Sequence, residues 1–168
     1  MKALLENAGK GKEYMRAILQ ISQIDSYIDE DVEITVSGCL KNEKVTIHAT
    51  MYDEQEKKFS SFATFIANDD GVINVATQKP IEGTYHTVDC SGLFWSMECV
   101  NSKHGDYFEK TNANKVDIEL SITINDQKQD AVTIHRYFYK NDVKKVTVQE
   151  ETIRGVLFHP EQKGQYLL

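Results

Sequence analysis

Apolar and polar residues alternate with a period of two along most of the chain from about Arg16 onward. The clearest run is 116–124, in which every second residue is Val, Ile or Leu. Successive side chains of a β-strand point to opposite faces, so this alternation predicts strands with one face on a core and the other in water. Amphipathic helices repeat every three to four residues and do not produce this spacing.

Eight or nine segments have this strand character, and no βαβ order separates them. They are 17–22, 32–37, 45–51, 58–67, 72–75, 116–124, 131–139, 144–149 and 153–158. Segment 58–67 is apolar on both faces, which predicts a strand covered on both sides. The polar run 125–130 predicts a hairpin loop. Short strands at close spacing predict an all-β fold, a two-sheet immunoglobulin-like β-sandwich, with a closed barrel as the competing all-β solution.

The length of 168 residues fits one domain that buries about 70% of the surface of the unfolded chain. No internal repeat and no linker rich in Pro and Gly divides it. We therefore expect an N-terminal lead-in at 1–16, a β-sandwich at 17–160 and a tail at 161–168.

Composition limits the classes of partner. A net charge of −7 disfavours nucleic acid and, more weakly, anionic membrane surfaces. No run of about 18 apolar residues is present, so the sequence predicts no membrane span. The three cysteines, Cys39, Cys90 and Cys99, are odd in number and lack the C-x-x-C spacing. Neither a disulfide framework nor a zinc site is indicated, and a reducing, cytoplasmic compartment is the simplest interpretation.

Catalytic chemistry has little support in the motifs. The chain has no G-x-S-x-G elbow and no glycine-rich phosphate loop, and its five histidines are scattered. The sequence thus predicts no catalytic residue, no metal and no cofactor. One alternative is a Cys90–His86 dyad, since a His four residues away can lower the pKa of a thiol. An incidental cysteine is the commoner case.

Arg136 lies in a predicted strand on the same face as Ile134 and Phe138, so an apolar face carries one guanidinium. It is a candidate for binding an acidic group across a domain seam. The alternative is an arginine that extends from the strand to water.

Residues 83–98 form the one long segment that strand and turn patterns leave unexplained, and they include the single Trp. The residues at 83–97 read Gly-Thr-Tyr-His-Thr-Val-Asp-Cys-Ser-Gly-Leu-Phe-Trp-Ser-Met, and those at 154–160 read Arg-Gly-Val-Leu-Phe-His-Pro. Together they resemble the N-terminal domain of the acyl-CoA thioesterase and bile acid-CoA:amino acid N-acyltransferase family. Cys90-Ser91 stands where the family usually has Pro-Met. Shorter matches extend the resemblance over about 18–160.

This resemblance implies a β-sandwich packed on a C-terminal α/β-hydrolase domain that carries the nucleophile. That enzyme would cleave acyl-CoA thioesters or transfer the acyl group to an amine. The present chain would then be an accessory domain, inactive alone, with the hydrolase domain as its partner and acyl-CoA as the substrate of the parent enzyme. The alternative is a free-standing sandwich that binds a ligand without chemistry.

Six residues are candidates for the interface with such a domain: Tyr85, Leu93, Phe94, Trp95, Met97 and Arg136. For Phe94 and Trp95 the simpler expectation is the sandwich core, because a Trp buried between two sheets is a common packing solution. The alternative is that the loop 92–97 faces the hydrolase domain and shapes its acyl entrance. An isolated domain would then expose an apolar patch there.

Overall fold

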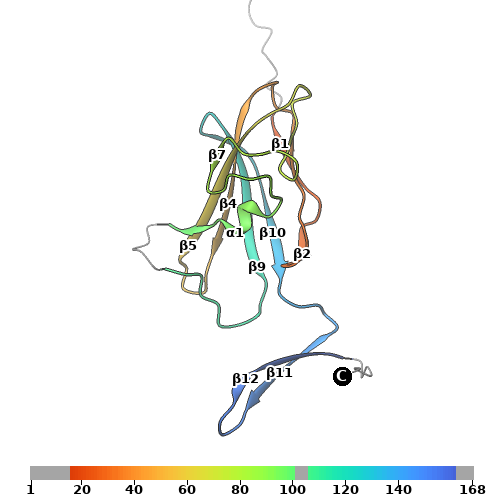
Figure 1. The fold of residues 1–168 in the computed structure, drawn as a ribbon, viewed down its shortest axis with the longest axis vertical. Coiled ribbons are helices and arrows are strands. Elements are labelled where there is room, and N and C mark those ends of the chain that lie inside the picture. The colour runs from red at the N-terminus through yellow and green to blue at the C-terminus, as the bar shows by residue number, and fades with distance from the viewer. Residues whose placement is uncertain (1–15, 101–105, 162–168) are drawn as a thin grey trace, which may run out of the picture.

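The computed structural model describes residues 16–100 and 106–161 (Figure 1). The predicted lead-in and tail therefore lie outside the described residues, except for Arg16 and Glu161 at their borders. The described part contains twelve strands and one short helix. The elements are β1 (Ile18–Ile21), β2 (Asp25–Tyr27), β3 (Ile34–Ser37), β4 (Lys44–Tyr52), β5 (Lys58–Ile66), β6 (Ile73–Asn74), β7 (Glu82–Gly83), α1 (Gly92–Trp95), β8 (Glu98–Cys99), β9 (Val116–Ile124), β10 (Gln127–Tyr137), β11 (Val143–Gln149) and β12 (Arg154–Pro160).

Two sheets build the sandwich. The larger has the order β2-β10-β9-β4-β5-β7, with β8 also paired to β5, and the smaller has the order β1-β3-β6. Most pairs are antiparallel, but β2 runs parallel to β10. One hydrophobic cluster joins residues of both sheets, so the sheets pack face to face. The prediction of an all-β sandwich is confirmed.

The period-two alternation corresponds to burial in the central strands. The buried residues are Val45, Ile47 and Ala49 of β4 and Val116, Ile118, Leu120 and Ile122 of β9. The residues between them on each strand are half-buried or exposed. Alternation therefore identified the core face of both strands from sequence alone.

Strand β5 departs from the expectation that both its faces are covered. Phe59 and Phe65 face the core, whereas Ile66 is exposed and Phe62 is half-buried beside His48, with ring centroids 6.3 Å apart. The smaller sheet covers only one face of the larger sheet, so the apolar residues on the other face of β5 remain near solvent.

The turn between β9 and β10 is tighter than the predicted loop 125–130. Asn125 and Asp126 have φ of 50° and 62°, the backbone of a two-residue hairpin turn. The rest of the polar run belongs to β10, which begins at Gln127 and contains a register shift between Lys128 and Asp130. Polar side chains misled the prediction, because an exposed strand end also carries them.

Strands β11 and β12 confirm the predicted strands at 144–149 and 153–158. They pair only with each other among the described strands, and none of their residues is buried. Figure 1 shows this hairpin below the sandwich, connected through the end of β10. No helix of the described chain is long and apolar enough to cross a membrane.

Candidate functional site

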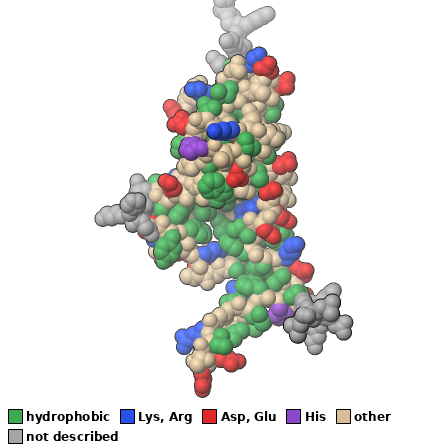
Figure 2. Space-filling model, viewed as in Figure 1, with side chains coloured by type: hydrophobic (Ala, Val, Ile, Leu, Met, Phe, Trp, Pro, Cys, Tyr) green, Lys and Arg blue, Asp and Glu red, His purple; other side chains and the backbone are tan. Residues whose placement is uncertain are grey.

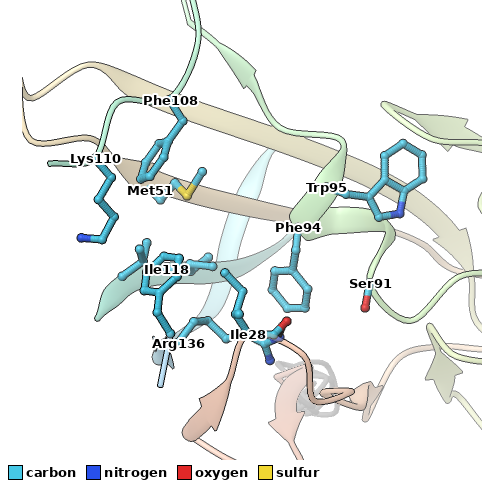
Figure 3. A pocket seen from close by; sticks show the side chains of 11 residues that line it. Ile28, Met51, Ser91, Phe94, Trp95, Phe108, Lys110, Ile118 and Arg136 are labelled. Carbon is cyan, nitrogen blue, oxygen red and sulfur yellow. Dashed lines mark hydrogen bonds between the residues drawn. The ribbon is translucent and has the colours of Figure 1, made fainter. Parts of the chain in front are cut away.

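An apolar cavity of about 430 Å³ opens where α1 lies over the ends of β4, β9 and β10 (Figure 3). Its lining comes from six separate segments of the chain: Ile28, Met51, Ser91, Phe94, Trp95, Phe108, Lys110, Val116, Ile118, Arg136 and Phe138. Volumes of about 300–1,000 Å³ are usual for small-molecule sites. Figure 2 shows hydrophobic side chains gathered around a hollow on this face of the molecule.

The helical turn α1 holds Phe94 and Trp95 at this cavity. Asp89 precedes it and accepts two hydrogen bonds, from the backbone N–H of Ser91 (2.8 Å) and from the indole N–H of Trp95 (2.9 Å). Gly92 lies on the ring of Tyr85 so closely that a Cβ there would be 2.3 Å from a ring carbon. Only Gly allows the turn to pack this tightly on a buried ring.

Arg136 enters the cavity from β10. Its side chain is buried and donates to the hydroxyl of Ser26 (2.9 Å) and to the backbone carbonyls of Ile28 (3.0 Å) and Glu30 (2.9 Å). The guanidinium carbon also lies 5.2 Å from the ring centroid of Phe94. Burial lowers the pKa of Arg136, while nearby carboxylates led by Glu30 oppose that shift. Because an arginine starts from such a high pKa, it stays charged.

Lys110 provides the second cation of the lining. Its ammonium lies 5.5 Å from the ring centroid of Phe138 and 3.7 Å from a carboxylate oxygen of Glu54. That carboxylate is engaged by closer donors, the backbone N–H of Thr111 (3.0 Å) and the amide of Asn112 (2.5 Å). Hydrogen bonds from Thr111 hold the pKa of Glu54 below its ordinary value.

Comparisons with known proteins show which family the chain belongs to. The model of a protein family described as "Acyl-CoA thioester hydrolase/BAAT N-terminal region" matches residues 29–150. The chain belongs to this family. The match includes the motif at 83–97, the α1 turn and Arg136, and it confirms the family that the sequence resembles. The second motif, at 154–160, lies beyond the matched residues.

Several curated proteins are similar to this member of the family. Acyl-coenzyme A amino acid N-acyltransferase 2 of Rattus norvegicus is 30% identical over 149 residues, which cover 82% of this chain and 35% of the relative. Bile acid-CoA:amino acid N-acyltransferase of Mus musculus is 26% identical over 155 residues, which cover 85% of this chain and 36% of the relative. Acyl-coenzyme A thioesterase 6 of Mus musculus is 26% identical over 143 residues, which cover 82% of this chain and 34% of the relative. The chain spans about a third of the length of these relatives.

Three of the six predicted interface residues line the cavity, namely Phe94, Trp95 and Arg136. Met97 is half-buried and lines a neighbouring hollow. Tyr85 and Leu93 lie in the core: Leu93 is a buried residue of α1, and the Tyr85 ring packs against α1 at Gly92. Arg136 does not extend to water, and its hydrogen-bond partners among the described residues are a hydroxyl and two carbonyls rather than a carboxylate.

The expectation that Trp95 belongs to the sandwich core is wrong, because its side chain is exposed. The indole is 60% exposed, with its ring centroid 6.1 Å from that of Tyr85. Phe94 takes the inward position and points toward Ile28 and Arg136 (Figure 3). Neighbouring residues of one helical turn diverge by about 100°, so only one of the two rings faces inward.

Sequence reasoning missed the opposite wall of the cavity, formed by Met51, Phe108 and Lys110. Phe108 and Lys110 lie in a connecting segment without strand or helix periodicity. Their role depends on contacts with distant strands, such as the packing of Phe108 on Phe59 (ring centroids 5.5 Å apart). No local pattern indicated these contacts.

The Cys90–His86 dyad is not formed among the described hydrogen bonds. Instead the thiol of Cys90 lies 3.3 Å from a carboxylate oxygen of Asp31 and 3.9 Å from the hydroxyl of Ser91. Burial and the hydrogen bond to Asp31 raise the pKa of Cys90. A nucleophilic cysteine needs the opposite shift.

We therefore expect Cys90 to react with iodoacetamide at pH 8 no faster than a free thiol, because a raised pKa leaves less thiolate. Peptide mass spectrometry over time measures this rate. Cys39 provides an internal reference, since burial raises its pKa to about 11 and should leave it unlabelled until the protein unfolds. Labelling of Cys90 about tenfold faster than glutathione would contradict the conclusion that Cys90 is not an activated nucleophile.

Proposed function

We propose that this chain is the accessory N-terminal domain of an acyl-CoA thioester hydrolase or acyl-CoA:amino acid N-acyltransferase. It packs on a C-terminal α/β-hydrolase domain and shapes the acyl entrance of that domain. Family membership and the names of the relatives support acyl-CoA as the substrate of the parent enzyme. The nucleophile belongs to the hydrolase domain, so the chain alone is not catalytic. We place the enzyme in the cytoplasm, although one relative is named a peroxisomal thioesterase.

The hairpin of β11 and β12 is the observation that carries this proposal. Its two faces both carry apolar side chains: Val146 and Leu157 share one face, and Val156 and Phe158 share the other. All four are exposed. A two-stranded hairpin is marginally stable alone, and strands apolar on both faces are typical of sheets covered by helices on both sides. The hairpin therefore fits the edge of an α/β sheet better than an isolated ribbon.

The rim of the cavity adds a second apolar surface. Ile28, Trp95 and Phe138 are exposed around it, and the hairpin continues directly from the end of β10. A domain that covers the hairpin would lie close to this rim. Such a position fits a sandwich that borders the acyl entrance of its partner.

The test begins with the reading frame beyond the codon of Leu168, which should continue and encode a G-x-S-x-G or G-x-C-x-G elbow. In that full-length protein, we expect Leu157→Asp to lower acyl-CoA turnover severalfold, because a charge would be buried against the partner domain. Turnover is measured as the rate at which free CoA is released. Gln149→Asp, at the exposed end of the same hairpin, should leave turnover unchanged.

A stop codon after Leu168, or full activity of the Leu157→Asp protein, would overturn the accessory role. The second candidate function would then lead. It is a free-standing binding module, and the apolar cavity is the observation that favours it.

A further inference from the structure

We propose that the apolar cavity binds a medium-chain fatty carboxylate, with its alkyl chain in the apolar interior and its carboxylate at the ammonium of Lys110. This site uses only residues of the sandwich and its connecting segments. It does not depend on the docking of a hydrolase domain.

The interior of the cavity suits an alkyl chain. Val116 and Ile118 form its floor and are almost fully buried, and Met51 lies beside them. The rings of Phe94 and Phe108 form two walls. Apolar cavities of this kind hold water poorly and accept apolar ligands. The flexible side chain of Met51 can adapt to chains of different length.

The charges of the lining select the sign of the ligand. Among the residues that the structure describes, the lining contains two cations, Lys110 and Arg136, and no Asp or Glu. A positively charged amphiphile would place its charge against these cations at the cost of like-charge repulsion. An amphiphile with a single negative charge complements them.

Lys110 is the better partner for the carboxylate. Its side chain is only 16% exposed, and its ammonium forms an ion pair with Glu54 at 3.7 Å, a distance too long for a hydrogen bond. Since Thr111 and Asn112 hold Glu54 through closer hydrogen bonds, the ammonium retains donors for a ligand. A charge-assisted hydrogen bond in such a partly buried place is stronger than one in water.

Arg136 supports the site without holding the ligand directly. Three of its N–H groups are used by Ser26, Ile28 and Glu30. The guanidinium is thereby fixed beneath the ring of Phe94, where it adds positive potential to the cavity. The carboxylate is thus attracted to this side of the molecule even though its hydrogen bonds go to Lys110.

The protein contains its own probe for this test. Trp95 is the single Trp, lines the cavity and is 60% exposed, so its fluorescence reports a ligand that covers it. The 168-residue protein is titrated with decanoate and decyltrimethylammonium below their micelle concentrations, and with decanol below its solubility limit. Calorimetry gives the stoichiometry.

We expect decanoate to bind at one site and shift the Trp95 emission to shorter wavelength. Its affinity should exceed those of decanol and decyltrimethylammonium about tenfold, the scale of one charge-assisted hydrogen bond. Equal affinity for decanoate and decanol, or no saturable binding of decanoate, overturns the proposal. Because no hydrolase domain is present in this experiment, its failure would leave the proposed accessory role untouched.

Two variants assign the ligand to this cavity. Lys110→Met keeps the aliphatic stem and should lower the affinity for decanoate to that for decanol. Lys41→Met is the matched control at an exposed lysine paired with Asp69, and it should not change binding. Met51→Trp fills the interior and should weaken all three ligands; calorimetry measures this, because the new Trp adds its own fluorescence. Thermal melts confirm that each variant is folded. Decanoate binding that survives both Lys110→Met and Met51→Trp overturns the assignment.

Discussion

Replacing Gly92 by Ala is expected to lower the free energy of unfolding by about 2–3 kcal/mol, the usual scale for overpacking a close-packed core. The new Cβ would lie 2.3–2.5 Å from three atoms of the Tyr85 ring, which is buried in the core. Either α1 lifts from the sandwich or the ring leaves its place. Urea unfolding followed by circular dichroism measures the loss.

Gly155→Ala is the matched control, because a Cβ at Gly155 meets no atom within 4 Å. It should unfold at the same urea concentration as the unmodified protein. Tyr85→Leu provides a second check, since removing part of the ring should make the cost of Gly92→Ala smaller than in the original background. If Gly92→Ala and Gly155→Ala unfold alike, the packing of α1 on Tyr85 does not stabilise the protein.

Arg136→Ala is expected to cost about 2–4 kcal/mol of stability, because it leaves buried acceptors without donors and empties part of the cavity wall. The carbonyls of Ile28 and Glu30 and the hydroxyl of Ser26 all lose their partner. The short β2 strand should become the least protected part of the sandwich. Urea unfolding gives the stability, and amide hydrogen exchange locates the loss.

Arg136→Lys should recover only part of this stability, because a single ammonium does not present the planar fork that reaches three acceptors. Arg154→Ala, at an exposed position on β12, is the control and should have little effect. Unfolding of Arg136→Ala at the same urea concentration as Arg154→Ala would show that the hydrogen bonds of Arg136 contribute nothing net.

Much of the sandwich was predictable because its determinants are local. In β4 and β9 the alternation of side chains with a period of two is itself the cause of burial, so the pattern identifies the core face. The motif at 83–97 likewise indicated the family without any knowledge of contacts, and the family match includes it. Where an exposed strand end is polar, as at 127–130, the same local reasoning mistakes a strand for a loop.

The sequence by itself thus determined the all-β class, the core faces of the main strands and the family. The tertiary structure decided which residues form the cavity, that Trp95 is exposed while Phe94 turns inward, and that β11 and β12 form a separate sheet. The physical reason is that periodicity specifies the direction of a side chain relative to its own strand. The partner it meets depends on how distant segments pack, and six such segments meet around the cavity that Arg136 and Lys110 line.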